Sequence, residues 1–198
     1  MSIRHKTSYL LLLGILTLFT ACSEDNDEVE EYPDWQDKNE SYWENLYNST
    51  QQKIFAGDAS WRIIRKYSYS DDMNINKDDN IIVHIVKQGE GTESPFITDS
   101  VKVHYQGKLL PSTSYPSGYI FDSSWTGTFN PATANPVKFL TGSLIDGWKT
   151  ALINMHAGDR WEIYVPYKLG YGTSESSSST IPPYSTLIFD VTLVDFWQ

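Results

Sequence analysis

The C-terminal half of the chain contains four stretches whose apolar residues are arranged as in β-strands: 81–86, 101–105, 161–165 and 186–196. In the second stretch, Val101, Val103 and Tyr105 fall on one face, and polar residues fall on the other. A looser alternation over 61–69 is compatible with one more strand. Alternation with a period of two is typical of antiparallel strands that bury one face, so we expect an antiparallel sheet.

Two helices are predicted by apolar residues that recur every three or four positions. The first stripe lies within 41–56 and ends before Gly57, and the second lies within 145–155 and ends before Gly158. The second stripe consists of four residues: Ile145, Trp148, Leu152 and Met155. One short helix packed on an antiparallel sheet gives an α+β fold. The first helix then forms an N-terminal appendage.

The first 22 residues have the pattern of a targeting segment. Arg4 and Lys6 form a basic start, an apolar run covers 9–19, and the segment ends in Phe19-Thr20-Ala21-Cys22. This ending resembles the cleavage box of bacterial lipoproteins, in which the cysteine becomes the lipidated N-terminal residue. Cys22 is the single cysteine of the chain, so an internal disulfide is excluded. An ordinary secretory signal with an unrelated cysteine is the alternative.

The lipoprotein interpretation predicts a signal peptide at 1–22 and a protein held by its lipid at the bacterial cell envelope, at the outer membrane. The periplasmic or the surface side stays open. Without this segment, which contains two basic residues and no acidic one, the chain has 13 Lys and Arg against 25 Asp and Glu, a net charge of −12. Such a charge argues against nucleic acid as a partner.

Nine of the acidic residues lie within 23–40, where Lys38 is the single basic residue. A segment of this composition does not bury enough apolar surface to fold alone, and we interpret it as an extended acidic tether. The alternative is an acidic signal for export to the cell surface. The predicted organisation is therefore a signal peptide at 1–22, a tether at 23–40, a helical extension at 41–80 and a folded domain at 81–198.

The sequence lacks the usual constellations of catalytic or metal-binding residues. Its four histidines are far apart, and no pair has the spacing of metal ligands. The loop 71–80 begins like a calcium loop, but Lys77 replaces the required glycine and Val83 stands where a glutamate belongs. His104 falls on the strand face opposite Tyr105, which favours a structural or solvated histidine. We therefore expect neither a metal nor a cofactor.

Seven sequence blocks instead occur in the order and approximate spacing of the FKBP-type prolyl isomerases. They are Val103-His104-Tyr105-Gln106-Gly107, Phe121-Asp122-Ser123-Ser124, Phe139-Leu140-Thr141-Gly142, Leu144-Ile145-Asp146-Gly147-Trp148, Leu169-Gly170-Tyr171-Gly172, Ile181-Pro182-Pro183 and Leu187-Ile188-Phe189-Asp190-Val191. The resemblance covers about 115 residues, from the region of Ile81 onward. It implies an FKBP-like fold, in which a curved antiparallel sheet of five or six strands wraps around one short helix.

The resemblance also implies an aromatic pocket between the helix and the sheet. Six residues are implied to be catalytic: Tyr105, Phe121, Asp122, Trp148, Tyr171 and Phe189. Trp148 is expected to form the pocket floor, and Asp122 to accept a hydrogen bond from the Tyr105 hydroxyl. Five further positions are implied to bind substrate: Val137, Leu144, Ile145, Gly170 and Ile181. The backbone N–H of Ile145 and the hydroxyl of Tyr171 are where the family binds substrate carbonyls.

The chain departs from the family pattern in two long stretches, 110–120 and 125–136, which are expected near the pocket. Val137 also replaces an aromatic wall residue that many members carry. These changes predict a reshaped substrate path and weaker binding of the family's macrolide inhibitors. The serine-rich run at 174–180 is expected to be mobile.

The function predicted from these residues is a peptidyl-prolyl cis/trans isomerase that acts on unfolded or partly folded proline-containing polypeptides at the cell envelope. A non-catalytic chaperone or peptide-binding module on the same fold is the first alternative, because a fold does not fix a function. A glycan-binding lipoprotein, suggested by 7 Trp and 13 Tyr, is the second. Two roles stay open for the helix at 41–56: it forms a homodimer, or it packs on its own domain.

Overall fold

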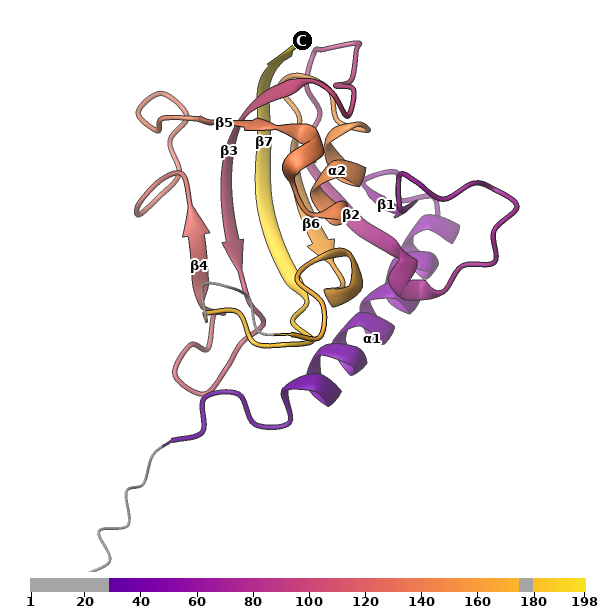
Figure 1. The fold of residues 1–198 in the computed structure, drawn as a ribbon, viewed down its shortest axis with the longest axis vertical. Helices are drawn as coiled ribbons and strands as arrows, with labels where there is room; N and C mark the ends of the chain where they lie inside the picture. The colour runs from indigo at the N-terminus through magenta and orange to yellow at the C-terminus, as the bar shows by residue number, and fades with distance from the viewer. Residues whose placement is uncertain (1–28, 175–179) are drawn as a thin grey trace, which may run out of the picture.

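The computed structural model describes residues 29–174 and 180–198, which form an antiparallel sheet with two α-helices (Figure 1). The predicted signal peptide, Cys22, the first part of the tether and most of the serine-rich run lie outside the described residues. The helices are α1 (Trp35–Phe55) and α2 (Asp146–Leu152), with 3₁₀ turns η1 (Lys77–Asp79), η2 (Thr141–Ser143) and η3 (Tyr167–Leu169). The strands are β1 (Trp61–Arg65), β2 (Asn80–Lys87), β3 (Ser100–Lys108), β4 (Ile120–Ser123), β5 (Val137–Leu140), β6 (Arg160–Val165) and β7 (Leu187–Trp197).

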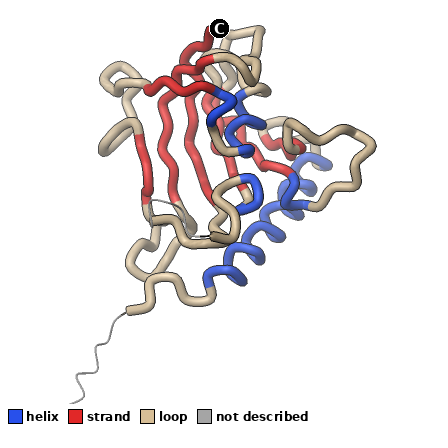
Figure 2. Tube along the Cα trace, viewed as in Figure 1, coloured by secondary structure: helices blue, strands red, loops and turns tan. Residues whose placement is uncertain are grey.

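The strands form a single sheet in the order β1-β2-β6-β7-β3-β4, and β5 also pairs with β3. All pairs are antiparallel. Helix α2 lies against one face of the curved sheet (Figures 1 and 2). The predicted α+β arrangement is confirmed, and within the described residues the sheet has seven strands in place of the five or six expected.

The four strongly patterned strands form where they were expected, and so does the strand at the start of 61–69. Strands β4 and β5 were not predicted from periodicity, because each has only four residues and follows a long irregular stretch. Both pair with β3, which is therefore bonded along its length to β7 on one side and to β4 and β5 on the other.

Helix α2 approaches the sheet closely because its second residue is a glycine. A Cβ atom added to Gly147 would lie 2.4 Å from Cγ1 of Val165 on β6, which is shorter than any normal contact. The helix then buries Trp148, Ala151 and Leu152 against the sheet. Close packing of this kind fixes the indole of Trp148, so the fold determines where that ring lies.

Helix α1 begins at Trp35, six residues before the predicted start at Ser41. Residues 35–40 therefore belong to the helix, and the predicted tether at 23–40 is wrong in this part. Apolar periodicity did not predict this start of the helix, because half of the buried residues of α1 are polar: Trp35, Asn39, Trp43 and Thr50. Before the helix, the carbonyl of Glu31 accepts a hydrogen bond of 3.3 Å from the N–H of Thr113.

The region 41–80 is part of the same fold and does not form a separate extension. Strand β1 pairs with β2, and the side chains of Trp35 and Trp43 belong to the common hydrophobic core. The ammonium of Lys66, just after β1, lies 2.7 Å from the carboxylate of Asp146 on α2. Within the described part of the chain, no helix has both the length and the apolar character needed to cross a membrane.

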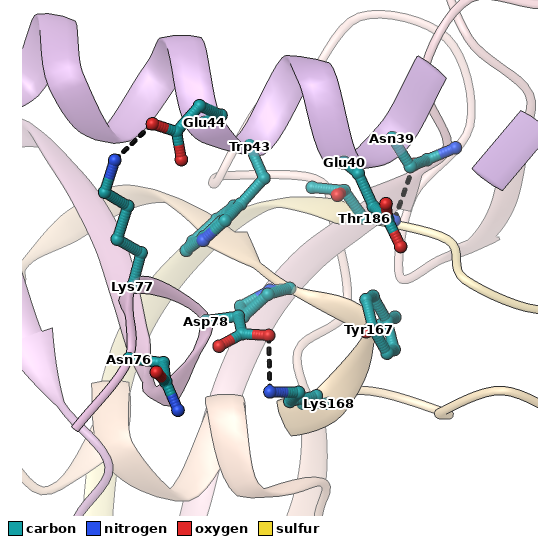
Figure 3. Close-up of a pocket in the computed structure, with 11 residues that line it drawn as sticks. Asn39, Glu40, Trp43, Glu44, Asn76, Lys77, Asp78, Tyr167, Lys168 and Thr186 are labelled. Atoms are coloured by element: carbon teal, nitrogen blue, oxygen red, sulfur yellow. Dashed lines mark hydrogen bonds and ion pairs between the residues drawn. The ribbon is translucent and has the colours of Figure 1, made fainter. Parts of the chain in front are cut away.

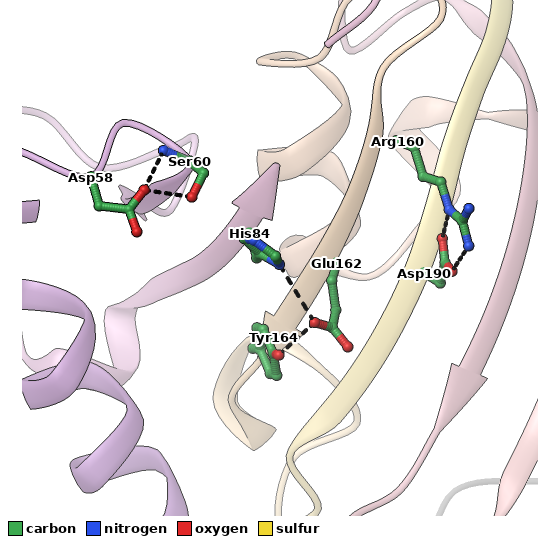
Figure 4. A network of polar contacts seen from close by, with 7 residues as sticks. All are labelled: Asp58, Ser60, His84, Arg160, Glu162, Tyr164 and Asp190. Atoms are coloured by element: carbon green, nitrogen blue, oxygen red, sulfur yellow. Dashed lines mark hydrogen bonds and ion pairs between the residues drawn. The ribbon is translucent and has the colours of Figure 1, made fainter. Parts of the chain in front are cut away.

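Successive residues of a strand point to opposite faces of the sheet, and part of the face opposite α2 carries polar side chains. Figure 4 shows part of it: the guanidinium of Arg160 donates two hydrogen bonds, of 2.9 and 2.6 Å, to the carboxylate of Asp190 on the neighbouring strand. The hydroxyl of Tyr164 donates to Glu162 at 2.7 Å, and Nδ1 of His84 lies 4.0 Å from the same carboxylate. We refer to this side as the outer face.

Candidate active site

A cavity of about 260 Å³ lies between α2 and the inner face of the sheet. Its lining comes from β3, β4, β5, η2, α2, β7 and the segment after η3: Tyr105, Phe121, Asp122, Phe139, Ser143, Leu144, Ile145, Trp148, Tyr171 and Phe189. Most of these side chains are apolar or aromatic, and Asp122 carries the single formal charge among them. Such a lining suits an apolar group of the size of one side chain.

The aromatic rings of the cavity contact one another edge to face. The ring centre of Trp148 lies 5.3 Å from those of Tyr105 and Phe189, at 86° and 88°, and 6.0 Å from that of Phe139. Phe121 in turn lies 5.6 Å from Phe189, at 87°. Edge-to-face contacts at this distance are the favoured arrangement of aromatic pairs. The rings therefore hold one another in place, and the cavity is formed before any ligand binds.

Gly107 on β3 allows Phe121 and Phe189 to meet. A Cβ atom at this position would lie 2.6 Å from Cε2 of Phe121 and 2.7 Å from Cε1 of Phe189. Both rings belong to strands that pair with β3, where Gly107 is opposite Asp122 on one side and Phe189 on the other. The glycine thus leaves the space that the two rings occupy.

The hydroxyl of Tyr105 donates a hydrogen bond of 2.7 Å to Oδ2 of Asp122, as the resemblance implied. Burial, together with the adjacent Asp122 carboxylate, raises the pKa of Tyr105 well above its ordinary value. Burial also raises the pKa of Tyr171, and the charge of Asp122 adds to this effect. Both phenols are therefore hydrogen-bond donors at neutral pH, and neither is positioned as a base.

Two donors remain available to a ligand at the cavity. Ile145 precedes α2 in an extended conformation, and within residues 29–174 and 180–198 its backbone N–H makes no hydrogen bond. The side chain of Tyr171 is 47% exposed, and its hydroxyl donates to none of the described residues. An amide carbonyl placed in the cavity can accept from these groups, because the first backbone N–H groups of a helix have no partner within the helix.

Comparison with known proteins agrees with this geometry. Residues 91–194, which are just over half of the chain, match the family model for FKBP-type peptidyl-prolyl cis-trans isomerase. The chain belongs to this family. It is 40% identical over 111 residues to the FKBP-type 22 kDa peptidyl-prolyl cis-trans isomerase of Escherichia coli, a match that covers 56% of this chain and 47% of the relative.

Two further proteins are similar to this chain. The chain is 37% identical over 114 residues to the macrophage infectivity potentiator of Trypanosoma cruzi, covering 58% of this chain and 52% of the relative. The crystal structure of FkpA from Escherichia coli matches with a TM-score of 0.55 and 27% identity, over 81% of this chain and 60% of FkpA. The chain thus spans about half the length of the curated relatives it matches.

The structure brings together all six residues that the FKBP resemblance marked as catalytic, along with Leu144 and Ile145. Val137, Gly170 and Ile181 do not line the cavity, and their assignment to substrate binding stays a prediction. Ile181 is 4% exposed and belongs to the core, and a Cβ atom on Gly170 would meet Leu187 at 3.0 Å. Ile181 is thus buried in the core, and Gly170 is half-buried beside Leu187.

Phe139 lines the cavity and was not among the predicted site residues, whereas Val137 was. Both residues face the same way, because they are two positions apart on β5, but only Phe139 has a ring, and it contacts Tyr105 at 5.6 Å. Val137 is opposite Val103 on β3, and Phe139 is opposite Val101. Ser143 also lines the cavity and was missed.

The two long stretches lie away from the cavity lining. Within 125–136, the ring of Phe129 is 5.2 Å from that of His104 and 5.1 Å from the guanidinium of Arg160. His104 is buried on the strand face opposite Tyr105, so this stretch reaches the outer face. The stretch 110–120 contacts the segment before α1, where Glu31 bonds to Ser112, Thr113 and Ser114. The expectation that these stretches reshape the substrate path is therefore not supported.

A second cavity, of about 490 Å³, lies between α1, η1 and η3 (Figure 3). Four of its five charged side chains form two pairs, in which Lys77 contacts Glu44 and the ammonium of Lys168 lies 2.6 Å from the carboxylate of Asp78. The fifth, Glu40, accepts a hydrogen bond of 2.9 Å from Gln36. Although this cavity is larger, its lining is mostly polar and is not the aromatic lining of an FKBP site. The smaller cavity at Trp148 is the candidate active site.

Proposed function

We propose that this protein is a peptidyl-prolyl cis/trans isomerase that acts on proline-containing polypeptides during the folding of exported proteins. One observation carries the proposal: a preformed apolar cavity in which Tyr105, Phe139 and Phe189 contact the ring of Trp148 edge to face. The same cavity offers the N–H of Ile145 and the hydroxyl of Tyr171 to a substrate.

The chemistry of the reaction fits such a cavity. An X-Pro bond isomerises slowly because twisting it breaks amide resonance, at a cost of roughly 18–20 kcal/mol. The planar amide is strongly polar and well hydrated, whereas the twisted amide has lost its resonance dipole. An apolar cavity therefore disfavours the planar amide more than the twisted one. A difference of about 4–6 kcal/mol gives an acceleration of a thousandfold or more.

No group of the cavity has to transfer a proton, because no covalent bond is made or broken. Asp122 accepts the hydrogen bond of Tyr105 and so orients that ring against Trp148. The donors at Ile145 and Tyr171 hold the substrate carbonyls while the imide bond turns. These roles make the site one of positioning and desolvation, in which metals and cofactors take no part.

The activity is tested with a chromogenic proline tetrapeptide and the full chain in detergent micelles. We expect kcat/KM to fall by a factor of roughly 100 in Trp148→Leu, because the floor of the cavity is removed. Trp161→Phe is the matched control. Trp161 is as buried as Trp148, at 1% and 4% exposure, but does not line the cavity. Equal activity of Trp148→Leu and Trp161→Phe would contradict the proposed site.

An inactive wild-type chain with an intact fold would instead favour the alternative, a non-catalytic chaperone or peptide-binding module. A chaperone activity is detected by measuring whether the wild type and Trp148→Leu suppress the aggregation of an unfolded client protein. Binding of a macrolide FKBP inhibitor, followed by calorimetry, provides a second probe of the same cavity. Residues 125–136 do not line this cavity and therefore do not occupy the space of the inhibitor. We expect the inhibitor to bind there and to compete with the peptide substrate.

We further propose that the protein is exported and attached to the bacterial outer membrane through a lipid on Cys22. The support is the sequence pattern of residues 1–22 and the acidic segment that follows. Metabolic labelling with palmitate, with Cys22→Ala as the control, tests the lipid. Protease access in intact cells then distinguishes the surface from the periplasmic side.

We also propose that the protein forms a homodimer through α1. The structure limits which face of this helix can contact the second copy. The buried stripe of α1 packs on its own domain, so a dimer has to form through the exposed side, where Phe55 is 95% exposed. Light scattering of the wild type and of Phe55→Asp decides this point. A monomeric wild type at high concentration would exclude the dimer.

A further inference from the structure

The start of α1 is joined to the chain just before β7 by a buried hydrogen bond. The indole Nε1–H of Trp35 donates to Oγ of Ser185 at 2.9 Å, and the Ser185 hydroxyl donates in turn to the carbonyl of Pro182 at 2.7 Å. Trp35 and Ser185 are 7% and 3% exposed. Each group in this relay has a partner, so the turn at 182–185 is held by the helix.

Asn39, one turn further along α1, makes a second connection. Its Oδ1 accepts a hydrogen bond of 2.7 Å from the backbone N–H of Thr186, a contact drawn in Figure 3. Its Nδ2 donates to the carbonyl of Trp35 at 2.7 Å. The side chain is 1% exposed, and both ends of its amide are used. A buried amide with both ends bonded has one orientation, so Asn39 fixes the position of Thr186.

The segment held in this way continues into two walls of the active site. Thr186 directly precedes β7, which carries Phe189 three residues later. On the other side, the N–H of Tyr184 donates to the carbonyl of Gly172 at 3.0 Å, next to Tyr171. Tyr184 has a φ of 62°, a backbone conformation that bulky residues adopt only when the surroundings enforce it.

We infer that α1 is a positioning element of the active site: Trp35 and Asn39 hold the segment 182–186, and through it the walls formed by Tyr171 and Phe189. The inference rests on the proposed isomerase function. Helix α1 lies outside residues 91–194, the part that matches the family model. The part of the chain before the FKBP domain therefore takes part in substrate binding without touching the substrate.

The test removes these hydrogen bonds from the full chain. Trp35→Phe keeps an aromatic ring and loses the N–H, and Ser185→Ala loses the acceptor of the same bond together with the bond to Pro182. We expect Trp35→Phe to lower kcat/KM roughly fivefold, the effect of one lost hydrogen bond, and Ser185→Ala at least as much, with most of the change in KM. The double variant should be no worse than Ser185→Ala alone, because that substitution already removes the bond from Trp35.

Trp43→Phe is the matched control on the same helix. Trp43 is 6% exposed, and its indole N–H has no hydrogen-bond partner among the described residues, so its loss should leave kcat and KM unchanged. Fivefold lower activity in Trp43→Phe as well would show a general effect of helix packing and would overturn the inference.

Amide hydrogen exchange separates this inference from the proposed function. We expect the N–H groups of Tyr184 and Thr186 to exchange faster in Trp35→Phe than in the wild type, while those of β3 stay protected. Unchanged exchange at both positions overturns the inference, even if the wild type is an active isomerase. An inactive wild type overturns the proposed function, and the exchange result still decides whether α1 positions the walls.

Discussion

The Tyr105 hydroxyl and the Asp122 carboxylate, 2.7 Å apart, join two neighbouring strands that both line the active site. The backbone N–H of Tyr105 also donates to the Ser124 hydroxyl at 2.9 Å. The tyrosine ring is therefore held at both its backbone and its tip. Because this ring contacts Trp148 and Phe139, the Asp122 carboxylate indirectly fixes the aromatic wall.

If Asp122 orients Tyr105 and transfers no proton, its charge matters less than its hydrogen bond. Asp122→Asn keeps an acceptor oxygen, so we expect kcat/KM within roughly threefold of the wild type, and a larger loss in Asp122→Ala. The tetrapeptide assay compares both variants with the wild type. A hundredfold loss in Asp122→Asn would make Asp122 a participant in the chemistry.

The space at Gly107 gives a second prediction. Gly107→Ala should displace the rings of Phe121 and Phe189 and destabilise the fold by about 1–3 kcal/mol, the usual cost of overpacking. It should also lower kcat/KM by roughly tenfold or more, because the cavity walls move. Denaturant unfolding and the tetrapeptide assay measure the two effects.

Gly127→Ala is the control for Gly107→Ala. Gly127 has a φ of 69° and no neighbouring atom within 4 Å of an added Cβ, so the substitution strains the backbone by about 1 kcal/mol without filling any space. It should lower stability and leave kcat/KM unchanged. If both variants lose activity in proportion to stability, the loss in Gly107→Ala does not come from the cavity.

The sequence predicted the site well where a residue's face is set by local alternation. Val101, Val103 and Tyr105 alternate on β3, and Trp148 and Leu152 recur on α2, so the central strand and the helix were both expected. Val137 and Phe139 point to the same face of β5, so alternation alone does not decide which of them lines the cavity. In the structure it is Phe139, opposite Val101, whose ring reaches Tyr105 at 5.6 Å.

The start of α1 was not predictable for a related reason. Asn39 is polar and lies among acidic residues, a composition that favours a disordered tether. Its burial depends on the N–H of Thr186, which is 147 residues away in the sequence. Trp35 likewise finds its partner Ser185 150 residues away. Local patterns contain no information about such long-range partners, so the contribution of α1 to the site emerged only from the structure.

The ion pairs at the start of α2 give a prediction for acid. Burial opposes ionisation of Asp146, but hydrogen bonds from Lys66 and Lys149, at 2.7 and 3.2 Å, outweigh it and lower the pKa of this carboxyl. A lowered pKa in the folded state means that the stabilisation is present above the unfolded pKa, about 4, and is lost as the pH falls through the folded value.

Asp146→Asn should therefore destabilise the fold by about 1 kcal/mol at pH 7, a value typical of a partly exposed pair. The difference from the wild type should shrink as the pH falls below about 4. Urea unfolding at pH 3, 5 and 7 checks this expectation. A difference that stays constant across this range would show that the carboxylate charge contributes nothing.

Alkaline pH should act on the buried tyrosines. Burial, with a smaller contribution from the charge of Glu162, raises the pKa of Tyr42 to about 12. A raised pKa in the folded state means that its stabilisation is complete below the unfolded value, about 10, and is lost as the pH rises through the folded value. The free energy of unfolding should thus fall between about pH 10 and 12, by roughly 1.4 kcal/mol per pH unit for each such tyrosine.

Tyr42→Phe tests this expectation by urea unfolding at each pH. Its free energy of unfolding should follow the wild-type pH dependence below pH 9, and above pH 10.5 it should fall less steeply by that amount. An unchanged alkaline slope in Tyr42→Phe would mean that this phenol ionises equally well in the folded and unfolded chain, and that α1 does not bury it against β6.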